Sequence, residues 1–146
     1  MKKILIFLLI FSTLSELKSQ TDSWAVVMSG DTDSEQYWCT SEHFPDAEIN
    51  QYWDKDYRIT SLSYGAGKWA LVMTKDGNYP QAWRGNKIFP EKEIQEFWDK
   101  NYRITSLSYG AGTWAVVMSK TSDYPQVWRT NIVFPEKEIK ELVKEK

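Results

Sequence analysis

The sequence predicts an α+β fold built from a repeated unit of three strands and one helix. The phrase YRITSLSYGAG stands letter for letter at Tyr57–Gly67 and again at Tyr102–Gly112. The phrases WAVVMS, WALVMT and WAVVMS begin at Trp24, Trp69 and Trp114, so the chain matches itself at steps of 45 residues. Within each step, the spacing of apolar residues changes from that of strands to that of a helix.

The first predicted element is a strand that leads into a hairpin. YRITSLSY, starting at Tyr57, is rich in residues that favour strands, and Gly65 and Gly67 can supply the positive φ of a tight turn. The partner strand, KWALVM at Lys68–Met73, carries apolar residues on both faces. A strand that is buried on both faces is expected at the centre of its sheet.

The third predicted strand lies at a sheet edge. It contains YPQAWR, which follows a turn at Lys75–Asn78. Pro80, and Pro125 one step later, have no N–H to donate to a neighbouring strand, which is typical of edge strands.

A helix closes each unit. In FPEKEIQEFWDK, Ile94, Phe97 and Trp98 form a stripe at i, i+3 and i+4, and Pro90 suits the start of a helix. The last such helix carries Ile139, Leu142 and Val143 in place of bulky aromatics, and is expected to cap the array.

We therefore expect three units, 24–68, 69–113 and 114–146, of which the first and last are incomplete. Because a helix between strands permits a crossover connection, mixed sheets are expected. The pattern is compatible with an open array and with a propeller-like ring. All three units belong to a single repeat domain at 20–146.

The first 19 residues have the layout of a secretory signal peptide. Lys2 and Lys3 precede the apolar run Ile4–Phe11, and cleavage is plausible after Ser19. The run is much shorter than the roughly 20 residues that span a membrane. The prediction is a secreted or periplasmic protein without membrane insertion after removal of the signal.

Charge and motifs argue against nucleic acid, metal and catalysis. Without residues 1–19 the chain keeps 15 basic and 19 acidic residues, well interspersed, which gives no attraction to nucleic acid. The acidic stretch GDTDSEQ at Gly30–Gln36 lacks the glycine and the distal Glu of a calcium loop. Cys39 and His43 are the single cysteine and histidine, and no nucleophile or metal motif surrounds them. We expect no enzyme activity, no cofactor and no metal.

A stripe of aromatic residues is the candidate binding surface. The three tryptophans of Q-x-W recur in phase on the predicted edge strand, where they can take a sugar ring or a partner strand. The alternative is that the stripe packs beneath the helix as core. The candidate binding residues are Trp38, Trp83, Trp128, Tyr79, Tyr124, Gln81 and Gln126.

Two resemblances follow from these phrases. YRITSLSYGAGKWALVMTK resembles the tryptophan-rich repeats that follow the kinase domain in plant casein-kinase-I-like proteins, with the repeat layout covered from Trp24 onward. That family has no known function, so the resemblance implies a fold and a scaffold-like role. QYW, QAW and QVW are similar to the repeats of ricin-type β-trefoil lectins, which imply sugar binding, although the helices depart from an all-strand trefoil.

The sequence thus favours a secreted, non-enzymatic module that binds another protein. The alternative is a carbohydrate-binding module that uses Trp83, Trp128 and Tyr79. A free strand edge in the first unit also permits a homodimer.

Overall fold

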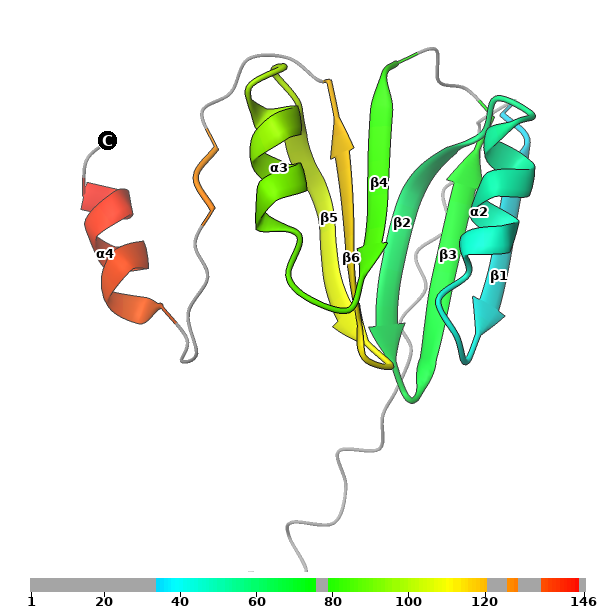
Figure 1. The fold of residues 1–146 in the computed structure, drawn as a ribbon, viewed down its shortest axis with the longest axis horizontal. Coiled ribbons are helices and arrows are strands. Elements are labelled where there is room, and N and C mark those ends of the chain that lie inside the picture. The colour runs from blue at the N-terminus through cyan, green and yellow to red at the C-terminus, as the bar shows by residue number, and fades with distance from the viewer. Residues whose placement is uncertain (1–33, 76–78, 121–125, 129–134, 145–146) are drawn as a thin grey trace, which may run out of the picture.

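The computed structural model describes residues 34–75, 79–120, 126–128 and 135–144 (Figure 1). These residues form a mixed α+β fold with two three-stranded sheets. The first sheet and its helix come from β1 (Gln36–Ser41), α2 (Asp46–Trp53), β2 (Arg58–Gly65) and β3 (Lys68–Thr74). The second come from β4 (Gln81–Asn86), α3 (Glu91–Trp98), β5 (Arg103–Gly110) and β6 (Thr113–Ser119). We refer to Gln36–Thr74 as the first unit and Gln81–Ser119 as the second unit.

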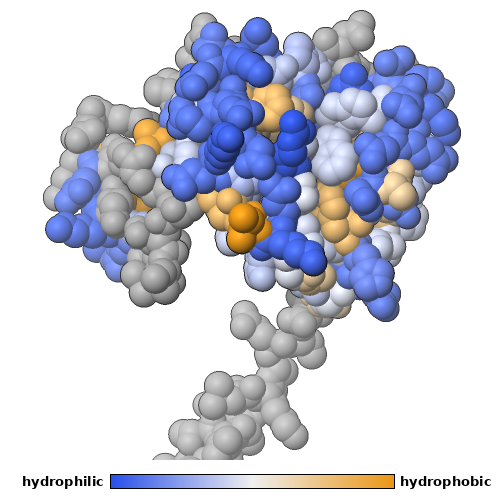
Figure 2. All heavy atoms as spheres, viewed as in Figure 1, coloured by the Kyte–Doolittle hydropathy of each residue, from blue (hydrophilic) through white to orange (hydrophobic). Residues whose placement is uncertain are grey.

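Helix α4 (Glu136–Lys144) follows the two units and stands apart from both sheets in Figure 1. Among the described helices, none combines the length and the apolar character needed to cross a membrane. The face seen in Figure 2 is mostly hydrophilic, with apolar residues in small separate patches.

Both sheets are antiparallel throughout, in the orders β1-β3-β2 and β4-β6-β5. The prediction of mixed sheets is therefore wrong. The helix does carry the chain between two strands of like direction, β1 and β2, as a crossover does. The hairpin then places β3 between them, so strands of like direction are never neighbours. Each sheet takes its central strand from the start of the next predicted unit, 69–113 or 114–146.

The hairpin forms where the sequence predicts it, with Gly67 at positive φ as predicted and Ala66 in place of Gly65. Ala66 and Gly67 have φ values of 47° and 76°, and Ala111 and Gly112 repeat them at 46° and 74°. Two successive residues of positive φ match the strand twist of a tight hairpin. Gly65 is the last residue of β2 and does not have positive φ, so that part of the prediction is wrong.

The central position of the WALVM strand is confirmed. Trp69, Leu71 and Met73 are buried on the face that carries the helix, together with Ile49 of α2. We call this helix-bearing side of each sheet the front face, and the opposite side the back face. Of the tryptophans that open these strands, Trp114 is half-buried, and Trp24 lies outside the described residues.

The two sheets share one core. Ala115 and Val117, on the back face of the second sheet, belong to the same buried cluster as Leu62 and Trp69 on the front face of the first. The front face of the second sheet packs on its own helix through a smaller cluster of Ile94, Val116 and Met118. The units thus stack back to front.

Candidate functional site

Two of the three Q-x-W glutamines, Gln81 and Gln126, bond the edge strand of the preceding unit. Gln81 Oε1 accepts a hydrogen bond from Ile59 N at 2.8 Å, and its Nε2 donates to Ile59 O at 3.0 Å. Gln126 makes the same pair with Ile104, at 2.8 and 2.9 Å. Both isoleucines stand beside a bulge on an edge strand, where backbone groups lack a ladder partner. The glutamine side chain therefore replaces a missing strand neighbour.

The tryptophans of the same motif pack on a phenylalanine of the preceding unit. The ring centroids of Trp83 and Phe44 are 5.9 Å apart, as are those of Trp128 and Phe89. Trp38 occupies the same position in β1 and is 73% exposed. No unit precedes β1 within the described residues, so Trp38 has no such phenylalanine. Trp83 packs against the core cluster that contains Ile49 of α2, and Trp128 against the one that contains Ile94 of α3. For these two tryptophans the expected alternative, packing as core beneath a helix, describes part of the contact.

Serine and glycine complete the junction along the free edge of β2. Ser106 Oγ donates to Leu62 O at 2.9 Å, and Tyr64 N donates to Ser108 Oγ at 3.2 Å. A Cβ on Gly110 would lie 1.9 Å from the Tyr64 ring, so this tyrosine lies directly on glycine backbone. The sequence signal for this contact is the alternate placing of Ser106, Ser108 and Gly110. The predicted binding surface was based on the aromatic stripe and not on this signal.

The back face of the first sheet carries the same kinds of residue and is open in the described structure. Trp38, Ser61 and Ser63 are exposed, and Ala70 and Val72 are half-buried. The equivalent residues of the second sheet, Trp83, Ser106, Ser108, Ala115 and Val117, form the junction. We call the open surface the Trp38 face, and it consists of Gln36, Trp38, Thr40, Ser61, Ser63, Ala70 and Val72.

The other predicted binding residues do not lie together on one described surface. Tyr79 and Gln81 line a hollow of about 220 Å³ at the junction, together with hydroxyl groups such as that of Ser119. This volume is below the range of most ligand clefts. Tyr124 lies outside the described residues. A binding role for these residues, and for Trp83, Trp128 and Gln126, stays a prediction.

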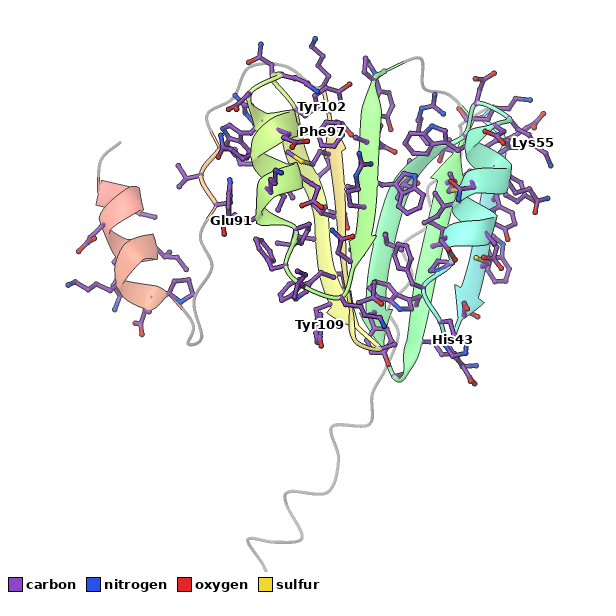
Figure 3. The ribbon with its side chains drawn as sticks, in the orientation of Figure 1. His43, Lys55, Glu91, Phe97, Tyr102 and Tyr109 are labelled. Atoms are coloured by element: carbon purple, nitrogen blue, oxygen red, sulfur yellow. The ribbon has the colours of Figure 1, made fainter. Side chains whose placement is uncertain are left out.

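Cys39 and His43 face different surroundings. Cys39 stands opposite Leu71 and packs against the core on the front face, whereas His43 is exposed (Figure 3). Burial raises the pKa of the Cys39 thiol, and the Glu48 carboxylate raises it further. A thiol with a raised pKa is a weak nucleophile at neutral pH. Within the described ranges, no three His, Cys, Asp or Glu side chains gather as metal ligands.

The chain belongs to a family described as a domain of unknown function (DUF7477), whose model matches residues 10–145. The matched range spans both units and α4. No curated protein matches the chain, and no solved structure does so either.

Proposed function

We propose that this chain is a secreted, non-enzymatic protein-interaction module that binds its partner through the Trp38 face. The carrying observation is that the equivalent face of the second sheet is buried against polypeptide. There, Ala115 and Val117 are each 1% exposed. The proposal includes three units in one stack, the third represented by Gln126–Trp128 and α4.

The chemistry of the Trp38 face indicates the kind of partner. Ser61 and Ser63 are the counterparts of the serines that bond a backbone carbonyl and a backbone N–H of β2. Trp38 is the counterpart of a tryptophan that packs on a phenylalanine. The face therefore suits a partner that offers a free strand edge with an aromatic ring beside it, a common mode of polypeptide recognition.

Site-specific photo-cross-linking tests this proposal. A photoreactive amino acid replaces Trp38 in one variant and Ile88 in the control. Ile88 is a suitable control because it is apolar and 81% exposed but lies outside the Trp38 face. We expect cross-linking at position 38 to one defined partner, with the cross-linked peptide mapping to a strand edge. Cross-linking at position 38 no stronger than at position 88 would contradict the proposal.

Carbohydrate binding is the second candidate, and the exposure of Trp38 favours it. A flat exposed indole with Gln36 two residues before it is a plausible platform for a sugar ring. Glycan-array binding that is lost in Trp38→Ala, with an unchanged melting temperature, would support this candidate. For Trp83→Ala we expect a lower melting temperature, because Trp83 packs at the junction.

A further inference from the structure

Two surfaces, one on β5 and one on α4, expose apolar residues whose counterparts elsewhere in the chain are buried. Leu107 on β5 is 44% exposed, whereas its counterpart Leu62 is 4% exposed. Ile139 on α4 is 42% exposed, whereas Ile94 at the same position of α3 is fully buried. Tyr109 is also exposed and projects from the β5–β6 hairpin in Figure 3. Leu107 lacks the cover that Leu62 has, and Ile139 lacks the cover that Ile94 has.

The helix surface lacks a central strand. In the second unit, Ile94 packs on Val116 and Met118, which face α3 from the central strand β6. Within the described residues, no strand lies under Ile139 in this way. The stripe on α4 therefore needs a strand with large apolar residues at alternate positions.

The β5 surface is not covered by the back face of a central strand. Leu62 is covered at the junction by the cluster that contains Ala115 and Val117, the back-face residues of β6. Leu107 has no such cover among the described residues. One central strand, placed between β5 and α4, would cover both surfaces, because successive side chains of a strand point to opposite faces.

The chain contains one further segment with the sequence of this strand. WAVVMS at Trp24–Ser29 is identical to WAVVMS at Trp114–Ser119 in β6. We propose that Trp24–Ser29 of a second copy of this chain supplies the central strand between β5 and α4. In the resulting third sheet, Val26 would face α4 and Val27 would face Leu107.

The spacing to β1 favours a second copy over the same chain. Ser29 precedes Gln36 by the same number of residues as Thr74 precedes Gln81. At this spacing, Trp24–Ser29 would reach the Trp38 face of its own chain, in the way that β3 lies beside the second unit. Glu35 is bonded to the first unit through Lys75 N at 2.9 Å, and the residues from Ser29 to Glu35 reach at most about 20 Å. The first unit and α4 lie at opposite ends of the molecule in Figure 1.

The register follows from the second unit. There, Gln81 stands opposite Ser119 and Trp83 opposite Val117. By the same pairing, Gln126 of one copy would stand opposite Ser29 of the other. Gln81 Nε2 also donates to Ser119 Oγ at 3.1 Å, and Ser29 would offer Gln126 the same acceptor. Contacts of this head-to-tail kind join unlike surfaces and extend from chain to chain or close into a ring.

This inference rests on the proposed function, because the composite sheet would also cover the Trp38 face of the copy that supplies the strand. The partner is then named: a second copy of this chain. All the exposed surfaces described above, on β5, on α4 and around Trp38, become buried at a single type of contact.

Sedimentation velocity with two complementary variants tests the inference. Val26→Asp places a charge on the strand, and Ile139→Asp places one on the helix surface that receives it. We expect the unaltered chain to associate as its concentration rises. Each variant should associate more weakly by a factor of about ten or more. A mixture of the two variants retains one intact strand and one intact receiving surface. We expect that mixture to form a dimer. Ile88→Asp, on an exposed residue outside the contact, should associate as the unaltered chain does.

Three outcomes would overturn the inference. The first is an unaltered chain that stays monomeric at all concentrations. This result would also be obtained if Trp24–Ser29 bound within its own chain, and it would overturn the inference in that case too. A mixture that stays monomeric, or a Val26→Asp variant that still associates fully, would do so as well. These outcomes leave the proposed function standing if the probe at position 38 still cross-links a different protein. Circular dichroism of each variant confirms that the two sheets remain folded.

Discussion

Leu62 and Leu107 stand at the same place in two identical phrases, yet Leu62 is buried and Leu107 is exposed. Tyr64 and Tyr109 differ in the same direction. The local backbone does not differ, because both phrases form a strand, a bulge at the same position and the same turn. The identical letters therefore determine the hairpin, and the next unit determines what the hairpin buries.

The back faces show the reverse difference. Trp83, Ala115 and Val117 of the second unit lie against the first unit, whereas Trp38 and its neighbours are open. Each described unit thus uses one of its two stacking surfaces at the junction. The first presents an open back face, and the second exposes Leu107 and Tyr109 on the part of its front face formed by β5.

Truncation of the paired leucines should show the largest contrast. Leu62→Ala removes a buried side chain and should lower the free energy of unfolding by about 3 kcal/mol. Leu107→Ala removes an exposed one and should cost less than about 1 kcal/mol. Urea denaturation at low protein concentration, where copies do not associate, measures both values. Equal losses would show that the two phrases have the same surroundings.

Gly110→Ala should give the next largest effect. The added methyl would lie against the Tyr64 ring, and overpacking of this kind should cost about 2 kcal/mol. The double variant with Tyr64→Ala should lose less stability than the sum of the two single variants, because the clash is then absent. Thermal unfolding of the three variants tests this coupling, and simple additivity would contradict the contact.

The glutamines should show a smaller contrast. Gln81→Ala leaves the N–H and carbonyl of Ile59 without their side-chain partner and should cost about 1–2 kcal/mol. Gln36→Ala changes an exposed residue of the Trp38 face and should stay within about 0.5 kcal/mol of the unaltered chain. Denaturation curves of both variants provide the measurement. A larger loss of stability for Gln36→Ala than for Gln81→Ala would contradict the structural role of Gln81 at the junction.

The Cys39 thiol should give the smallest effect. Because burial raises its pKa, iodoacetamide should alkylate it more slowly in the folded chain than in urea at the same mildly alkaline pH. The raised pKa also sets the sign of the pH dependence. The stability contributed by the neutral thiol is complete below the ordinary cysteine pKa and declines as the pH rises through the folded value. Equal alkylation rates would show that Cys39 is not shielded.

Much of the fold follows from local patterns. The apolar residues on both faces of WALVM predict a central strand, and the stripe of Ile94, Phe97 and Trp98 predicts a helix; both are confirmed. The sheet type was predicted wrongly because strand pairing is not a local property. A crossover helix favours parallel neighbours, and only the position of β3 between β1 and β2 separates them.

The role of the Q-x-W motif was harder to predict. An in-phase Gln and Trp is expected both of a ligand-binding surface and of a contact between units. The bond from Gln81 to Ile59 depends on which unit lies beside which edge, and spacing along the chain does not contain that information. Trp38 illustrates the limit, because its letters match Trp83 while its exposure does not.

Amide hydrogen exchange at low protein concentration tests the central claim most directly, which is that the repeated phrase is a stacking surface. Tyr64 N is bonded by Ser108, and within the described residues no side chain bonds Tyr109 N. Ile59 N and Ile104 N are each bonded by a glutamine and serve as the matched control. The account predicts similar protection for the isoleucines and about tenfold slower exchange at Tyr64 than at Tyr109. Equal protection of the two tyrosines would contradict it.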